Sequence, residues 1–161
     1  MNNSTFKDWN LKEIKDMTNV SQLVLDKTIT PENIKELFKG VKDKNGNEYM
    51  PFKDYLNRNL VLTRKNFEYH TSKKYLGDNE LRHELFAHVK DILNNPDELW
   101  ITKSESGLRY RYVKFFNYNN ENTAILVDTE IKDFGTQITS WHFLKVEETQ
   151  KRKGLLVKSN P

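Results

Sequence analysis

The chain has 161 residues and carries 26 Lys and Arg against 23 Asp and Glu, a formal net charge of +3. Nine Phe, seven Tyr and three Trp supply enough large side chains for a core, which argues against a wholly disordered chain. The absence of Cys excludes a disulfide framework, a thiolate zinc site and a cysteine nucleophile. No stretch approaches the roughly 18 apolar residues of a membrane span, and the N-terminus lacks a signal-peptide pattern. We therefore expect a protein of the cytoplasm, in the producing or a target cell, with no membrane partner.

Apolar residues recur at helical spacing in the first half of the chain. Thr30 and Pro31 suit the start of one such helix, and the Asn-Asn-Pro sequence at 94–96 ends the most regular one. The expected helices cover residues 6–17, 31–41, 52–60 and 79–93.

After Pro96 the pattern changes to short runs of β-branched and aromatic residues separated by polar turns. Their close spacing favours an antiparallel meander. The expected strands cover residues 99–103, 108–116, 123–128, 137–145 and 155–158. The sequence therefore predicts an α+β fold, with N-terminal helices packed on a four- to five-stranded antiparallel sheet formed by the C-terminal half. We expect residues 1–60 to form a helical extension or subdomain and residues 61–161 to form the main domain.

The chain lacks the sequence patterns that are typical of metal-binding and nucleotide-binding sites. His83 and His88 lie five positions apart, which turns them to different sides of a helix, whereas a zinc-binding helix needs a spacing of four. No phosphate-binding loop and no dinucleotide-binding glycine pattern is present. We therefore expect neither a metal nor a cofactor.

Basic and aromatic side chains alternate along the expected strand 108–116. By that alternation Tyr110, Tyr112 and Lys114 share one face, and Arg109 and Arg111 share the other. The positive excess of the whole chain lies in residues 103–161, which favours an anionic partner for this half.

Ser140 and His142 share a face of another expected strand by the same rule. A metal-independent ribonuclease uses these residue types: His moves protons, Lys or Arg neutralises the phosphorane, and an aromatic ring stacks on a base. Structural explanations stay open at this point. His142 can be a hydrogen-bonded strand residue, the Arg and Lys side chains can form ion pairs, and the basic run at 151–153 can be a loop.

The order of several motifs in the second half resembles a known nuclease superfamily. The motifs are Tyr-His-Thr at 69–71, Asn-Pro-Asp-Glu at 95–98, Arg-Tyr-Val-Lys at 111–114, Leu-Val-Asp at 126–128, Thr-Ser-Trp-His at 139–142 and a basic segment at 152–158. In this order they are similar to the phage-borne nuclease domains of the barnase/EndoU/colicin/RelE-like superfamily, which occur in phage head-morphogenesis proteins and polymorphic toxins.

The resemblance implies that residues 61–161 form a small α+β nuclease domain whose open sheet side holds RNA. It implies a metal-independent endoribonuclease, acting as a toxin or effector, that cleaves by attack of the 2′-OH through a 2′,3′-cyclic phosphate. The implied partners are RNA, with tRNA as one candidate, and an immunity protein or antitoxin. The alternative is a catalytically inactive module on the same fold that binds RNA or protein.

The resemblance also implies which residues form the site. The expected catalytic residues are His142, His70, Lys114, Ser140 and Thr139. From the residue types and their spacing, the expected substrate-binding residues are Arg109, Arg111, Tyr110, Tyr112 and Arg152. His142 and His70 are expected to act together, across the face of the sheet, as general acid and general base.

Overall fold

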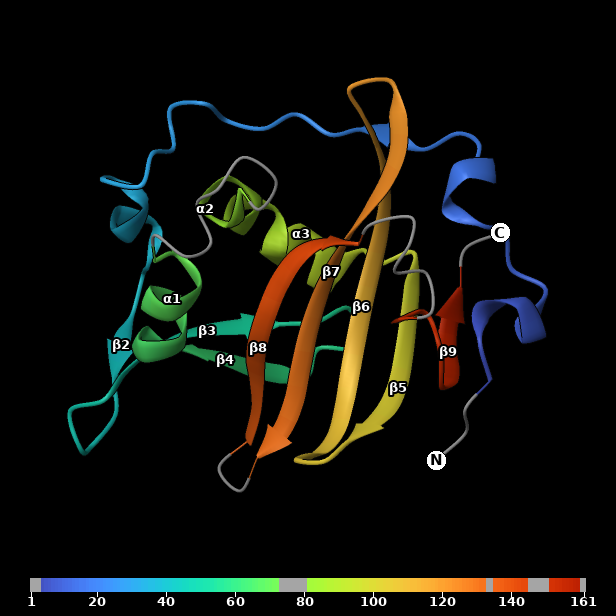
Figure 1. Ribbon diagram of the computed structural model, residues 1–161. Coiled ribbons are helices and arrows are strands. Elements are labelled where there is room, and N and C mark those ends of the chain that lie inside the picture. Colours follow the sequence, from blue (N-terminus) through green and yellow to red (C-terminus); the bar gives the residue numbers. More distant parts are fainter. Residues whose placement is uncertain (1–3, 73–80, 133–134, 145–150, 160–161) are drawn as a thin grey trace.

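A long antiparallel meander forms the centre of the computed structural model, which describes residues 4–72, 81–132, 135–144 and 151–159. Its strands are β5 (Glu98–Ser104), β6 (Gly107–Tyr118), β7 (Glu121–Lys132) and β8 (Gly135–Leu144), each antiparallel to the next (Figure 1). A final strand, β9 (Leu155–Ser159), pairs with the outer edge of β5. These are the five strands that the sequence predicts. β5, β6 and β7 extend beyond both predicted boundaries, and β8 begins two residues earlier than predicted; its predicted end at residue 145 lies outside the described residues.

The sheet is larger than the four to five strands expected, because the first half of the chain adds to it. β2 (Val41–Lys42), β3 (Glu48–Lys53) and β4 (Asn59–Thr63) pair in antiparallel order, and β4 joins the start of β8 in parallel. A short β1 (Ser21–Gln22) pairs in parallel with β6. The result is a mixed, mostly antiparallel sheet of nine strands within an α+β fold.

The helix expected over residues 52–60 is wrong, because this segment reverses direction between β3 and β4. The Asp54 carboxylate accepts the backbone N–H groups of Leu56 and Arg58 at 3.0 and 2.9 Å. Asn57 takes a left-handed conformation with φ 63°. Hydrogen bonds from an Asp side chain to the following backbone compete with helix formation and close the turn.

The helices that pack on the sheet come from the middle of the chain rather than from residues 1–60. They are α1 (Arg64–His70), α2 (Arg82–Leu85) and α3 (Val89–Asn94), with one 3-10 turn (Phe86–His88) between the last two. These confirm the helix expected over 79–93 in its described part. The helices expected at 6–17 and 31–41 are reduced to three short 3-10 helices, Phe6–Trp9, Ile14–Asp16 and Ile34–Leu37. None of the described helices is long and apolar enough to cross a membrane.

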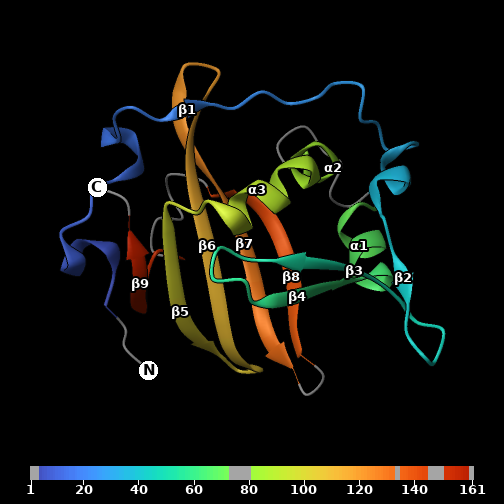
Figure 2. The ribbon, with the colours of Figure 1, turned by 180° about the vertical axis from the view of Figure 1, so that it is seen from behind.

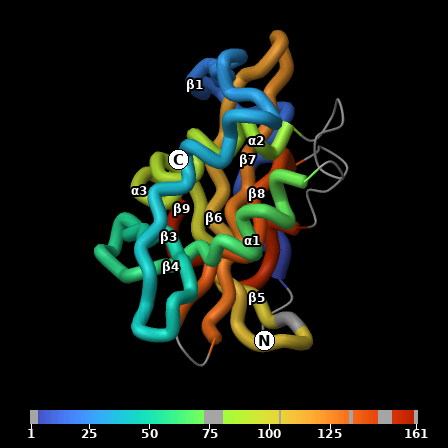
Figure 3. Tube along the Cα trace, turned by 90° about the vertical axis from the view of Figure 1, so that its left-hand side faces the viewer, coloured from blue at the N-terminus to red at the C-terminus, as the bar shows by residue number. Residues whose placement is uncertain are grey.

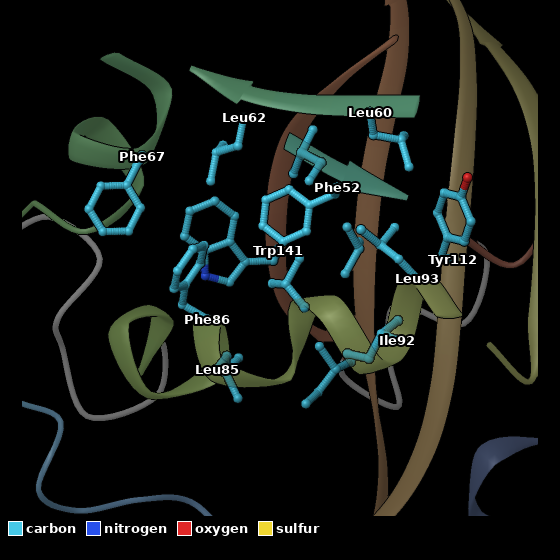
Figure 4. Packing of buried hydrophobic residues seen from close by; sticks show 14 of the residues in the cluster. Phe52, Leu60, Leu62, Phe67, Leu85, Phe86, Ile92, Leu93, Tyr112 and Trp141 are labelled. Carbon is cyan, nitrogen blue, oxygen red and sulfur yellow. The ribbon is translucent and has the colours of Figure 1, made fainter. Parts of the chain in front are cut away.

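The helices and the β3–β4 hairpin cover one face of the meander, as the view from behind shows (Figure 2). From the side, this hairpin lies on one side of β6, β7 and β8 (Figure 3). Trp141 and Tyr112 point from the meander into the resulting core, where they meet Phe52, Phe86 and Ile92 (Figure 4). We call this side of the meander the helix face. It holds the main hydrophobic core.

The opposite side of the meander is apolar at one end only. There Phe6 and Ile14 from the N-terminal segment pack against Trp100, Val113 and Phe115. The other end carries polar side chains of β6, β7 and β8. We call this side of the meander the polar face.

The boundary expected at residue 60 does not coincide with an edge of the sheet. β2 and β3 precede it, yet they belong to the same sheet as the meander. The division of the chain into two units therefore stays a prediction.

Arg152 forms a fully buried ion pair beside the apolar cluster of Phe6, Trp100 and Phe115 on the polar face. Its Nε donates to Oε1 of Glu98 at 2.8 Å, its Nη1 donates to the Lys12 carbonyl at 2.9 Å, and its guanidinium lies 4.3 Å from the centre of the Phe6 ring. A buried charge that loses its partner is costly, because the remaining charge has no water to solvate it.

We predict that Arg152→Met lowers the free energy of unfolding by about 3–5 kcal/mol, because it leaves the Glu98 carboxylate buried without its cation. Urea unfolding measures the change. The control is Lys7→Met, which removes a largely exposed partner of Glu13, and it should stay within about 0.5 kcal/mol of the original protein. Equal, small losses in both variants would contradict the structural role of Arg152.

Candidate active site on the polar face

Strand register brings polar residues of β6, β7 and β8 together on the polar face. Arg109 lies opposite Glu130, and Arg111 lies opposite Asp128. Asp128 in turn lies opposite Ser140 on β8. Cross-strand neighbours on one face have side chains close enough to interact, so these residues form a continuous row across three strands.

Arg111 and Asp128 form the buried centre of this row. Arg111 Nε donates to Asp128 Oδ1 at 2.8 Å, and Arg111 Nη1 donates to the Lys151 carbonyl at 2.8 Å. Both side chains are less than 9% exposed. The Arg111 guanidinium is thus committed to protein partners, and it fixes the Asp128 carboxylate and the Lys151 backbone relative to each other.

Glu130 is the second carboxylate of the row. Burial alone would raise its pKa, but hydrogen bonds from Lys132, Arg109 and Ser106 outweigh burial and hold the pKa at about 2. Arg109 Nη2 donates to Glu130 Oε1 at 2.6 Å, and the Arg109 side chain remains 28% exposed. Arg109 therefore presents part of a paired guanidinium to the surface.

His142 lies two residues beyond Ser140 on β8 and faces the same side. Its Nδ1 is 2.8 Å from the Phe143 carbonyl oxygen, which can only accept, so Nδ1 carries the proton. None of the described residues hydrogen-bonds to Nε2. Burial lowers the pKa of His142, with the Lys151 charge acting in the same direction, while the Phe143 bond and Asp128 act against them. The imidazole is therefore held in its neutral form, with the lone pair on Nε2.

A comparison with known protein families shows to which family the chain belongs. A model of the family described as phage-Barnase-EndoU-ColicinE5/D-RelE like nuclease2 matches residues 36–157, about three quarters of the chain. The chain belongs to this nuclease family. No curated protein and no solved structure matches it. Membership implies a nucleic-acid substrate and confirms the family resemblance found in the sequence motifs.

Three of the residues expected in the nuclease site lie on the helix face, on the opposite side of the meander from His142. Tyr112 is fully buried and its hydroxyl donates to Asp54 at 2.7 Å (Figure 4). Tyr110 lies on the same face beneath the guanidinium of Arg58, 4.6 Å from the ring centre. Lys114 shares their face, as predicted, and its ammonium donates to the Asn95 carbonyl at 2.7 Å, at the end of α3. The structure does not bring these residues together with His142.

His70 and His142 lie on opposite sides of β8. The His70 ring packs against Trp141, at 5.4 Å between ring centres, and Arg82 Nη1 lies 3.1 Å from its Nδ1. Trp141 belongs to the helix-face core, whereas His142 faces the polar side. The expected cooperation of the two imidazoles across one face is therefore not built into this fold.

Arg152 also lies away from the polar row, since it is fully buried against Glu98 and Phe6. Its neighbour Lys151 is the member of the basic run that reaches the site, because its charge acts on His142 and its carbonyl accepts from Arg111. The basic run at 151–153 was a signal for this cation, but periodicity could not tell which residue of the run it was.

Asp128 and Glu130 are the other site residues that sequence reasoning missed. Their signal was the alternation of acidic side chains in the Asp-Thr-Glu sequence at 128–130, on the strand next to the two arginines. Among the described residues, no group of three or more His, Cys, Asp or Glu side chains is placed to hold a metal ion.

The lowered pKa of His142 predicts a pH dependence of stability. Folding favours the neutral imidazole, so its contribution is fully present above the ordinary pKa of 6.5 and is lost as the pH falls through the folded pKa. Urea unfolding between about pH 8 and about pH 5 should show a steeper loss of stability on acidification for the original protein than for His142→Gln. Identical slopes would show that His142 titrates alike in the folded and unfolded chains.

Proposed function

We propose that this nuclease-family chain is a metal-independent endoribonuclease whose reaction takes place on the polar face, with His142 as general base. One observation carries the proposal. The Nδ1–H bond to the Phe143 carbonyl leaves the Nε2 lone pair of a neutral imidazole without a described partner, on the face that also presents Arg109 and Ser140. A neutral His with an accessible lone pair is the group that most readily removes a proton near neutral pH.

In the proposed reaction, Nε2 of His142 takes the proton of the ribose 2′-OH. The 2′-oxygen attacks the adjacent phosphorus, the bond from phosphorus to the 5′-oxygen breaks, and the leaving oxygen takes up a proton from water. The hydroxide so formed takes the proton from His142, which restores the neutral imidazole. The products are a 2′,3′-cyclic phosphate and a free 5′-OH. Because the nucleophile belongs to the substrate, this chemistry requires RNA and excludes a purely deoxyribose strand.

Cations around His142 would stabilise the extra negative charge of the phosphorane. Lys151 is close enough to lower the pKa of His142, and Arg109 presents a partly exposed guanidinium farther along the face. Asp128 acts in the other direction, since its charge favours the imidazolium that forms once the proton has moved. Ser140 lies opposite Asp128 and two residues before His142 on β8, and its hydroxyl can donate to a phosphate oxygen.

The polar face carries a small net positive charge, which suits binding of a nucleic acid. Arg109, Arg111 and Lys132 face two carboxylates, Asp128 and Glu130, through hydrogen bonds of 2.6–2.8 Å. Three positive charges against two negative ones leave a net positive row. We assign phosphate contact to Arg109, whose side chain is partly exposed, and to Lys151, whose charge acts on His142.

A role as a toxin or effector, tRNA as the substrate, and restraint by an immunity protein or antitoxin are parts of the same proposal. They rest on the motif resemblance, with support from membership in a phage nuclease family.

We predict that the chain fragments total RNA in the presence of EDTA, and that His142→Ala lowers the rate about 10²–10⁴-fold while the circular dichroism spectrum is unchanged. Gel electrophoresis of the RNA measures both. The control is Lys103→Ala, which removes an exposed cation of β5 from the opposite face of the sheet and should leave the rate unchanged.

Two results would overturn the proposal. RNA that is bound in a gel-shift assay but never cut would favour the inactive binding module. Cleavage that EDTA abolishes, or that His142→Ala leaves intact, would remove the proposed mechanism.

A further inference from the structure

β8 loses its neighbouring strand just where the site begins. β4 pairs with β8 only at Thr136 and Gln137. Beyond that point α1, which follows β4 directly, takes the place of a strand. Its Asn66 donates through Nδ2 to the carbonyl oxygens of Ile138 and Thr139, at 2.7 and 3.2 Å.

Bonding of one amide to two successive carbonyls is unusual for a strand. In a regular strand successive carbonyls point to opposite edges. Here the pairing with β7 contains a bulge: Ile138 lies opposite Thr129 and Ser140 opposite Asp128, which leaves Thr139 as the extra residue. The bulge turns both carbonyls toward α1, and Asn66 bonds to them there.

A second hydrogen bond holds the bulge from the side of β7. The Thr139 hydroxyl donates to the Asp128 carbonyl at 3.2 Å. Asn66 and Thr139 therefore hold the extra residue from the two neighbouring elements, α1 and β7.

The bulge decides which side chains reach the polar face. Ile138 and Trp141 are three positions apart, yet both are fully buried in the helix-face core. A regular strand would send one of them to each face. With one extra residue between them, Ser140 and His142 are directed to the polar face, beside Asp128. Loss of the bulge would shift the register by one and exchange the faces.

We propose that Asn66 is a positioning residue of the nuclease: it holds the β8 bulge and thereby keeps Ser140 and His142 in place on the polar face. This inference rests on the proposed function for its catalytic consequence, but its structural part can be measured separately. Asn66 acts through the backbone of β8 and needs no contact with the substrate.

The most direct variant is Asn66→Asp, which is isosteric but has no donor and turns a carboxylate toward two carbonyl oxygens. The backbone N–H of residue 66 can still bond to the Thr63 hydroxyl, at 3.2 Å in the original protein, so the start of α1 is kept. With an RNA substrate we expect kcat to fall by about 10- to 100-fold with KM changed by less than about threefold, because misplacement of a general base affects the chemical step.

The matched control is Glu68→Gln on the same helix. It makes the reverse exchange of carboxylate and amide at an exposed position whose ion pair with Arg64 spans 3.6 Å. Its kcat should equal that of the original protein. An equal loss of kcat in both variants would mean that α1 is sensitive to any change, and would overturn the inference.

NMR provides a readout that does not depend on activity. In Asn66→Asp we expect the amide signals of residues 138–140 to move and the His142 pKa to rise toward its ordinary value as the ring becomes more exposed. If Asn66→Asp does not fold, Asn66→Ala is measured in the same way, since it removes the donor without adding a charge.

Each outcome decides the inference. Lower kcat with moved signals supports it, whereas unchanged kcat, or lower kcat with unmoved signals at residues 138–140, overturns it. If the original protein does not cleave RNA, the proposed function fails, and the NMR signals alone decide whether Asn66 positions Ser140 and His142.

Discussion

Two apolar side chains three residues apart, Ile138 and Trp141, have to reach one core from a single strand. An ideal strand cannot do this, because its side chains alternate between faces. β8 meets the constraint with an extra residue at Thr139, held by Asn66 and by the Asp128 carbonyl. The core thereby fixes the direction of Ser140 and His142. Packing on the helix face and the chemistry proposed for the polar face depend on the same bulge.

Two buried ion pairs hold neighbouring elements of the polar side of the meander together. Arg111–Asp128 and Arg152–Glu98 are both removed from water, and each is bonded through two guanidinium nitrogens to its carboxylate. Pairs of this kind add little net stability over apolar residues, but they strongly resist the loss of one member. Arg152 ties the N-terminal segment to β5, and Arg111 ties β6 to Lys151. Lys151, whose charge acts on His142, is therefore attached to β6 through its own backbone carbonyl.

The sequence predicted the meander well and the first half of the chain poorly. Alternating β-branched and aromatic residues determine where strands run in β5 to β8, because burial of one face enforces the pattern. The segment 52–60 looked helical from its apolar spacing, yet side-chain hydrogen bonds from Asp54 made it a turn between two strands. Local competition of this kind is invisible to periodicity. The prediction of long N-terminal helices was wrong for a related reason. The chain turns at Asn10, and two short 3-10 helices are enough to bury Phe6 and Ile14.

The site was predictable in part, and the limit has a physical cause. Alternation correctly grouped Tyr110, Tyr112 and Lys114 on one face and Ser140 with His142 on another, but it does not say which face is packed. That depends on where the helices and the β3–β4 hairpin lie, which is a property of the whole chain. The same limit hid Asn66, whose role exists only because β4 ends its pairing with β8 at Gln137.

In the proposed mechanism, His142 on the polar face activates a ribose 2′-OH. The most direct test is cleavage of a DNA oligonucleotide that contains a single ribonucleotide, in EDTA, with the products weighed by mass spectrometry. With this mechanism we expect one cut, on the 3′ side of the ribonucleotide, a 2′,3′-cyclic phosphate on the upstream fragment, and no cut when the 2′-oxygen is methylated. Cleavage between deoxyribonucleotides, or an upstream fragment that ends in a 3′-OH, would contradict it.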